Sequence, residues 1–412
     1  MGRAAEVVVV GAGIIGASIG YELARHEAGT VVVLDKARSP GEGSTGASSS
    51  ISRCRYTHSE VIRLALHGQR AYAGWSRFTG LERPRSGLNR VGVMWMMGES
   101  IEKTQRDVER LRSEGVDAEW LNPEELRDLF PVLSDCGEPF DLTGEVEHVC
   151  EPGEAFLYEP GGGYSDPVGA NQDLIDAALG RGVSIEFDSP VVDLMKEGDR
   201  VAGVRLADGS AISAGLVINA AGPWCNALNE QAGFDHRWTL NPTRIQTIYR
   251  SWPDSLGALP VGADASTGIY FRPELGTRQV LVGSVRAEDE VEIVDDPDSF
   301  RRVPDPGFSE IVLAALHHRL PDLEARGDVT GIAGLYTINR EDVHPIVGPS
   351  GVDGFWVANG FSGHGFKLAP GIGSMIAQAL TGRSMEFDTD VEMGFFAVDR
   401  DPIELDVKSV LA

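Results

Sequence analysis

The sequence has few cysteines and no long apolar run, and each shortage excludes a class of protein. Its four cysteines form no C-x-x-C pair and have no histidine partner at the spacing of a zinc site. No stretch reaches the roughly 18 apolar residues that a membrane-spanning helix requires. We therefore expect free thiols, no metal ion, no membrane partner and a soluble, cytoplasmic protein.

Basic residues are also scarce. The chain has 36 Lys and Arg residues against 62 Asp and Glu residues, which gives a formal net charge of −26. Affinity for nucleic acid comes chiefly from Lys and Arg that neutralise phosphates, so this charge argues against a nucleic-acid partner. Lysine is so rare that any lysine near a reactive centre stands out.

Glycine, in contrast, is abundant. The 412 residues include 50 glycines without the three-residue period of collagen, which is typical of a turn-rich globular protein. A chain of this length exceeds one ordinary hydrophobic core and predicts two domains.

The first 35 residues show the pattern of a β-α-β unit. An apolar strand is predicted over 7–10, an amphipathic helix over 14–26 and a second apolar strand over 30–34. This order predicts a parallel sheet with helices packed on it.

A glycine-rich turn joins the first strand to the helix. Gly11, Gly13 and Gly16 form a G-x-G-x-x-G pattern, which brings backbone N–H groups and a helix N-terminus toward a pyrophosphate. Asp35 ends the second strand, where an acidic residue accepts hydrogen bonds from a ribose. Together these residues predict a dinucleotide site, but they do not distinguish FAD from NAD.

Four later motifs decide between the two cofactors. They are Gly43-Ser-Thr-Gly-Ala-Ser-Ser, Gly161-Gly-Gly-Tyr-Ser-Asp-Pro, Val217-Ile-Asn-Ala-Ala-Gly-Pro-Trp and Gly360-Phe-Ser-Gly-His-Gly-Phe-Lys. In their order along the chain, over about 6–381, the sequence resembles the D-amino acid oxidase superfamily of FAD-dependent oxidoreductases. Within it, the branch of sarcosine, dimethylglycine and glycine oxidases is the most similar.

The resemblance implies an α/β fold with two domains. A Rossmann-type FAD-binding domain is expected over 1–85, 151–225 and 330–412, and a largely antiparallel β-sheet domain that binds substrate over 86–150 and 226–329. Besides the glycine turn and Asp35, the residues expected to contact FAD are Lys36, Ser44, Thr45, Ser48, Ala221, Gly222, Trp224, Gly363, Gly365, Phe366 and Lys367.

Similarity to monomeric sarcosine oxidase also implies the substrate site. Arg53 and Lys367 fall on two cations that grip the substrate carboxylate, and cationic side chains suit that task. Tyr336 aligns with a tyrosine of the substrate pocket, and His364 is placed beside the flavin ring. Tyr270 lies on a predicted strand that faces the pocket, although a core position suits it better.

The sequence departs from monomeric sarcosine oxidases at two positions. Gly334 stands where those enzymes attach FAD through a cysteine, so we expect the flavin to be bound non-covalently. The segment 281–285 lacks the lysine that promotes reaction with oxygen, which leaves open a dehydrogenase that uses another electron acceptor.

We expect oxidation of a small or secondary, N-methylated amino acid, by hydride transfer to flavin N5, to an imine that water hydrolyses. A carboxylate clamp suits a 2-hydroxy acid equally well, so a 2-hydroxy acid dehydrogenase is one alternative. A flavin-carrying subunit of a larger amine oxidase is another.

Overall fold

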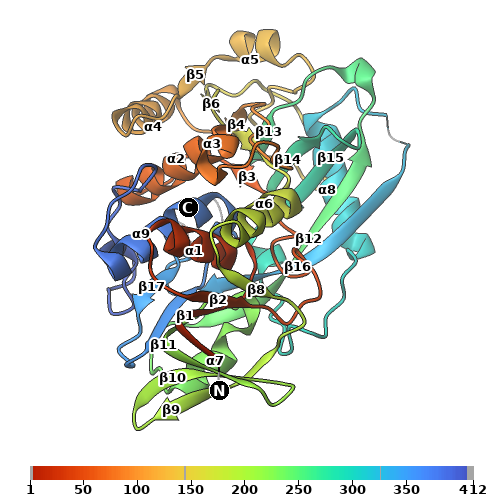
Figure 1. Ribbon diagram of the computed structural model, residues 1–412. Coiled ribbons are helices and arrows are strands. Elements are labelled where there is room, and N and C mark those ends of the chain that lie inside the picture. Colours follow the sequence, from red (N-terminus) through yellow and green to blue (C-terminus); the bar gives the residue numbers. More distant parts are fainter. Residues whose placement is uncertain (1–2, 143–144, 325, 406–412) are drawn as a thin grey trace.

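The computed structural model describes residues 3–142, 145–324 and 326–405, and its framework is two eight-stranded sheets (Figure 1). The first sheet has the strand order β17-β18-β11-β1-β2-β8. Two further strands belong to it, because β10 also pairs with β11 and β9 pairs with β10. Its strands are β1 (Arg3–Val10), β2 (Val31–Leu34), β8 (Ser184–Glu186), β9 (Val191–Glu197), β10 (Arg200–Leu206), β11 (Ala211–Asn219), β17 (Ile346–Pro349) and β18 (Phe355–Asn359).

The centre of this sheet is parallel. Strand β1 pairs in parallel with β11 and β2, β11 with β18, and β2 with β8. The run 7–10 is buried on both faces, which explains its continuous valines. The predicted β-α-β unit is therefore confirmed, and its strands end together at one edge of the sheet.

Helices cover this sheet. Helix α1 packs between α9 and α6, and α2 packs on α9 (Figure 1). The helices of this layer are α1 (Ile14–Arg25), α2 (Ser59–Ala73), α3 (Trp75–Thr79), α6 (Pro167–Leu179) and α9 (Gly365–Thr381), with α7 (Cys225–Ala232) after β11. Helices α2 and α9 approach closely, because a Cβ on Gly68 would lie 1.8 Å from the carbonyl oxygen of Lys367.

The second sheet has the order β16-β12-β15-β14-β13-β4-β6-β5, and all its pairs are antiparallel except β13 with β4. The predicted fold class is thus confirmed. The strands are β4 (Val93–Met96), β5 (Glu119–Leu121), β6 (Phe156–Glu159), β12 (Leu240–Ser251), β13 (Val261–Asp264), β14 (Ile269–Glu274), β15 (Gln279–Ser284) and β16 (Val329–Asn339).

Helix α8 (Pro306–Arg319) packs against β14 and β15, and its residues Phe308, Val312 and Leu316 join the core of this sheet. The remaining elements are α4 (Ile101–Ser113), α5 (Pro123–Leu129), the small sheet of β3 (Ile51–Ser52) and β7 (Gly163–Tyr164), and 3-10 turns at Gly222–Trp224, Asp254–Leu256, Ala287–Glu290 and Met393–Phe396.

Two strands do not follow the predicted division of the chain. β6 and β16 lie in ranges predicted for the FAD-binding domain, yet both pair within the second sheet. Each is the last strand of the second sheet before the chain passes to the first sheet, and its hydrophobic pattern alone does not reveal the sheet to which it belongs. The limits of the two domains stay a prediction.

Among the described residues, no helix combines the length and the apolar character needed to cross a bilayer.

Candidate flavin and substrate site

A cavity of about 630 Å³ opens at the edge where the parallel strands end. This is the position at which open α/β sheets bind their ligands, and its volume is in the usual range of cofactor pockets. The predicted cofactor residues that line it are Gly11, Gly13, Asp35, Lys36, Ser44, Thr45, Ser48, Ala221, Gly222, Trp224, Gly363, Gly365 and Phe366. Gly16 and Lys367 do not line it.

The three glycines of the turn have two different roles, one in the fold and one at the cavity wall. Gly11 has φ +106°, and a Cβ on Gly16 would lie 1.8 Å from the Gly11 carbonyl oxygen, so these two glycines are required by the fold itself. Gly13 has φ −65°, and a Cβ there would come no closer than 3.1 Å, to Thr45 Oγ1. The missing side chain of Gly13 therefore leaves space at the cavity wall, as the approach of a pyrophosphate requires.

The N-terminus of α1 faces this space. Gly13 is its N-cap and offers no side-chain cap, while Ile14 N donates to Thr45 Oγ1 at 3.0 Å. The N–H groups of a first helical turn carry a partial positive charge, which attracts an anion. The turn can thus hold a diphosphate.

Asp35 lies at the end of β2, on the cavity wall. Its Oδ2 accepts from Ala12 N at 2.6 Å and its Oδ1 accepts from Ala37 N at 2.8 Å. The carboxylate thereby fixes the glycine turn against the second strand, and its remaining lone pairs can accept from a ribose hydroxyl.

Asp298, which was not predicted from the sequence, lies at the rim of the cavity. Lys36 forms an ion pair with Asp298, and its Nζ lies 4.0 Å from the centroid of a Trp224 ring. Trp224 Nε1 also donates to Asp298 Oδ1, at 3.1 Å. Asp298 belongs to the connection between the second sheet and α8, and nothing in the local sequence indicates that it returns to the dinucleotide turn.

Beyond the cavity, the structure brings the two predicted carboxylate-binding cations together. Arg53 and Lys367 are buried, with 5 % and 6 % of their surfaces exposed. Burial, with the neighbouring Arg53 charge, holds the pKa of Lys367 well below its usual range. Among the described residues, Lys367 has no ion-pair partner. Such a buried cation is poised to receive an anion.

Arg53 is held by aromatic rings. Its guanidinium carbon lies 4.2 Å from the ring centroid of Tyr56 and 5.2 Å from that of Trp95. Both distances are within the range of cation–π attraction.

A buried carboxylate that the sequence analysis missed orders the loop that carries Arg53. Glu159, in β6, accepts from Cys54 N at 2.7 Å, from Arg55 N at 3.1 Å and from Trp95 Nε1 at 2.8 Å. Burial raises its pKa. The available signal was a single acidic residue at the end of the apolar run 155–159.

Tyr336 lies on the cavity wall, near Arg53. It lines the cavity, where a Cβ on Gly363 would be 2.6 Å from its ring, and it is hydrogen-bonded to Tyr270. Burial raises the pKa of Tyr336 well above its usual range, and the charge of Arg53 opposes this shift. Tyr270, for which a core position was the safer prediction, is buried but reaches the site through this bond.

His364 is buried at the N-cap of α9 and does not line the cavity. Its ring meets the Tyr56 ring edge-on at a centroid distance of 5.3 Å. The structure thus places it behind Arg53 and Tyr56, so a direct contact with the flavin ring stays a prediction.

The two departures from monomeric sarcosine oxidases have structural counterparts. Gly334, in β16, packs so closely on Ala47 that a Cβ would lie 2.4 Å from the Ala47 Cβ, which leaves no room for a cysteine. In β15, Gly283 lies beneath Tyr270, whose ring would be 2.3 Å from a Cβ at that position.

The combination of a glycine turn, an acidic residue on the second strand and a second antiparallel sheet is that of a flavin-binding oxidoreductase, and the comparisons agree. Residues 6–379 match the family model described as "FAD dependent oxidoreductase" (DAO), and the chain belongs to this family. It is therefore an FAD-dependent enzyme, and the cavity fits the cofactor.

The chain is similar along most of its length to several known proteins. The chain is 26% identical to the mitochondrial dimethylglycine dehydrogenase of Rattus norvegicus over 93% of its length, but it spans only 44% of that protein. It is 25% identical to the glycine oxidase of Geobacillus kaustophilus, covering 93% of this chain and 94% of the relative. The crystal structure of L-proline dehydrogenase from P. horikoshii has the same fold, with a TM-score of 0.79 at 22% identity over 96% of this chain and 98% of that one.

Proposed function

We propose that the protein oxidises a small amino acid at the carbon next to nitrogen, with secondary and N-methylated amines as the favoured substrates. The observation that carries this proposal is the pair of buried cations, Arg53 and Lys367, next to the flavin cavity. FAD, when bound, supplies the hydride acceptor. Loss of a hydride from the neutral amine leaves an iminium ion, which gives up a proton to become the imine. Water then hydrolyses the imine to a carbonyl compound and the remaining amine.

The residues of the chain bind and orient the substrate. A carboxylate placed between Lys367 and Arg53 would neutralise two cations that repel each other, so both attractions favour the complex. Arg53 lies against two rings and therefore approaches the carboxylate in one orientation. Tyr336, on the cavity wall near Arg53, then lies near this anion site.

The relatives support an amine over other carboxylates. They include dimethylglycine dehydrogenase, glycine oxidase and 4-methylaminobutanoate oxidase, and each of these names contains an amine that also carries a carboxylate. The chain spans less than half of the dimethylglycine dehydrogenases, so it corresponds to only one part of such an enzyme. We propose that this part contains the whole flavin site, held non-covalently because Gly334 leaves no space for a cysteine link.

The test is anaerobic reduction of the flavin. Purified, FAD-loaded protein would be mixed with N-methyl, cyclic and D-amino acids, and loss of the oxidised flavin absorbance would be followed. We expect bleaching by at least one of these amines, with release of formaldehyde from an N-methyl substrate. Bleaching by 2-hydroxy acids alone would overturn the amine proposal in favour of a 2-hydroxy acid dehydrogenase.

A second measurement identifies the acceptor. Strand β15 contributes no lysine to the site, and we propose slow reoxidation by oxygen and faster reoxidation by an artificial electron acceptor. Air reoxidation that keeps pace with substrate reduction would contradict this part.

A further inference from the structure

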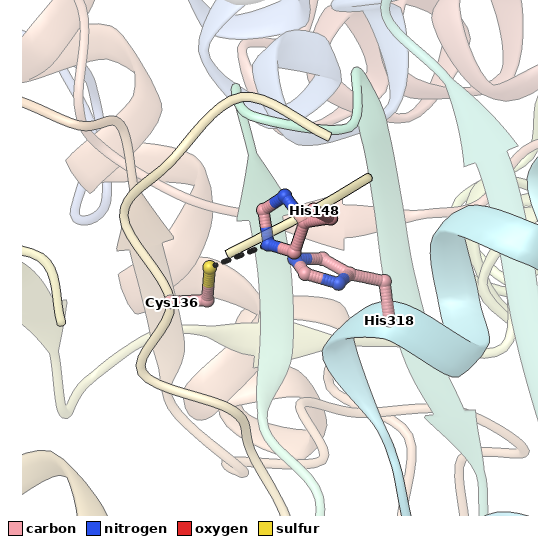
Figure 2. Close-up of side chains that lie close together, drawn as sticks. All are labelled: Cys136, His148 and His318. Atoms are coloured by element: carbon pink, nitrogen blue, oxygen red, sulfur yellow. Dashed lines mark hydrogen bonds between the residues drawn. The ribbon is translucent and has the colours of Figure 1, made fainter. Parts of the chain in front are cut away.

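A cluster of metal-binding side chains lies outside the flavin site, at the C-terminal end of α8. Cys136, His148 and His318 each direct one ligand atom to a common point, and these atoms all lie within 4.8 Å of one another (Figure 2). Cys136 Sγ is 3.3 Å from His148 Nε2. No metal site is predicted from the sequence, because these residues are separated along the chain and only the fold joins them.

We propose that Cys136, His148 and His318, together with Cys150, bind a structural Zn²⁺ ion. Two thiolates and two imidazoles form a Cys₂His₂ set, which is one of the usual tetrahedral zinc sites. The flavin reaction does not involve this site.

Cys150 is the candidate for the fourth ligand. Its thiol is near enough to Cys136 for that residue to help raise the pKa of Cys150, and both cysteines are free, but its sulfur lies outside the group of three and would have to move toward it. Cys150 is exposed while Cys136 is buried, so an ion could enter from the side of Cys150.

The spacing suits zinc. With Zn–S of about 2.3 Å and Zn–N of about 2.0 Å, the edge of a tetrahedron between sulfur and nitrogen is about 3.5 Å. The 3.3 Å between Cys136 Sγ and His148 Nε2 is close to that edge. The other atoms of the group lie within 4.8 Å of one another and would have to draw closer as the ion binds.

Backbone contacts hold the two cysteine segments side by side. Cys136 forms an isolated β-bridge with Pro152, and Gly137 N donates to the carbonyl oxygen of Glu151 at 2.8 Å. Gly137 and Gly153 have no side chains to separate the strands, because a Cβ on Gly137 would be 2.5 Å from Gly153 Cα. The geometry therefore exists before any ion binds.

Helix α8 is fixed to the same segment through the neighbour of His318. Arg319 is fully buried and forms an ion pair with Asp264 at 3.0 Å. Ser134 N donates to the Arg319 carbonyl oxygen at 2.8 Å. His318, which precedes Arg319, is thus held beside Ser134, two residues before Cys136 in the chain.

His318 itself indicates a missing partner. Its Nε2 is buried and has no hydrogen-bond partner among the described residues. The ring stacks on Phe140 with a centroid distance of 4.2 Å. Ring packing explains why one face of the imidazole is covered, but a buried nitrogen without a partner costs about 1–3 kcal/mol. A metal ion would provide the partner.

In a second group of possible metal ligands, the side chains already have hydrogen-bond partners. Glu22, His26 and Asp388 also lie within 4.8 Å of one another. However, both carboxylate oxygens of Glu22 accept from Arg25 at 2.7 Å, and Asp388 Oδ2 accepts from Met385 N at 2.6 Å. These groups already have partners, so we assign no ion to them.

The test is the zinc content of the FAD-loaded full chain. Protein purified without chelator, or stripped and reloaded with Zn²⁺, should hold about one zinc per chain by mass spectrometry of the metal. Because loss of an outer-shell partner alone weakens metal binding 10–100-fold, His318→Ala and Cys150→Ser should each weaken zinc binding at least tenfold. Control variants are His317→Ala, on the adjacent residue of α8, and Cys225→Ser, at a thiol outside the cluster.

Cobalt substitution gives a readout that does not depend on zinc retention. Co²⁺ bound by thiolates in a tetrahedral site should give visible absorption at longer wavelengths than the flavin bands, and Cys150→Ser should lose it. Binding should also release protons from the two thiols.

Three results would overturn the proposal. They are a zinc content well below one after reloading, equal zinc in His318→Ala and His317→Ala, or a Cys136–Cys150 disulfide in the isolated protein. Cys150 is exposed, so Cys150→Ser leaves the core intact and tests the proposal without a substitution at the buried Cys136.

Discussion

Replacing Lys367 by methionine would test the anion site with little change of shape. Methionine is unbranched and fills much of the volume of the lysine stem, but it carries no charge. Lys367 is 6 % exposed and has no ion-pair partner among the described residues, so the change removes a cation without leaving a buried carboxylate behind.

The expected loss of affinity follows from the lost interaction. A hydrogen bond to a charged group contributes about 1.5–3 kcal/mol, which corresponds to a rise of about 10–150-fold in the Kd of a carboxylate substrate. The assay is anaerobic titration of the bound flavin with the substrate found in the panel, or with a non-reactive carboxylate analogue that perturbs the flavin spectrum. FAD content should not change, because Lys367 does not line the cofactor cavity.

The same substitution has an opposite effect on folding stability. The pKa of Lys367 lies well below its ordinary value of 10.5, mainly because the ammonium is buried. Between the lowered pKa and 10.5 the unfolded chain binds more protons, so the stability of the ligand-free protein rises with pH across this window. The methionine variant should therefore have a higher Tm than wild type at pH 7, and the difference should shrink as the pH approaches 10.5.

Lys103→Met is the matched control, since Lys103 is exposed on α4 and pairs with Glu99 at 2.8 Å. It should change neither substrate affinity nor the pH dependence of Tm. The reasoning is refuted if Lys367→Met binds the carboxylate as tightly as wild type, or if its Tm falls at pH 7 while its FAD content is normal.

Substitutions around the cavity separate loss of flavin from loss of the fold. Gly13→Val should give folded, colourless protein, because the new side chain fits the backbone but fills the space expected for the pyrophosphate. Gly16→Ala should instead unfold the protein, because its Cβ would lie 1.8 Å from the Gly11 carbonyl oxygen. Circular dichroism measures the fold and flavin absorbance measures the bound cofactor, so together they distinguish the two variants. Asp35→Ala should lower flavin affinity and cost about 1–3 kcal/mol of unfolding free energy in denaturant titrations, because two backbone N–H groups lose their acceptor. Gly334→Cys should destabilise by about 1–3 kcal/mol through overpacking on Ala47 and carry no flavin in a denaturing gel; a fluorescent band would contradict the steric argument.

Much of the dinucleotide half could be predicted from the sequence. The valine runs, the glycine turn and Asp35 are local in the chain, and the geometry of a β-α-β unit relates their spacing to a single arrangement. The assignments of the second sheet were less complete. Strands β6 and β16 have the apolar pattern of either sheet, and only pairing with distant partners decides where they belong.

The candidate site could likewise be predicted only in part from the sequence. Arg53 and Lys367 were named from motif resemblance, yet their mutual distance and burial depend on the packing of α2, α9 and the β3 segment, which no local pattern encodes. Glu159 and Asp298 were missed because each is an ordinary acidic residue until the fold places it next to its partners.

The sequence by itself determined the flavin-binding turn and the class of enzyme, because these depend on backbone conformation and spacing over a few tens of residues. Only the tertiary structure decided which side chains from distant segments meet. Cys136, His148 and His318 are the clearest case, since the segments that carry them join through backbone pairing and the Arg319–Asp264 ion pair, and such long-range contacts leave no periodic signal in the chain.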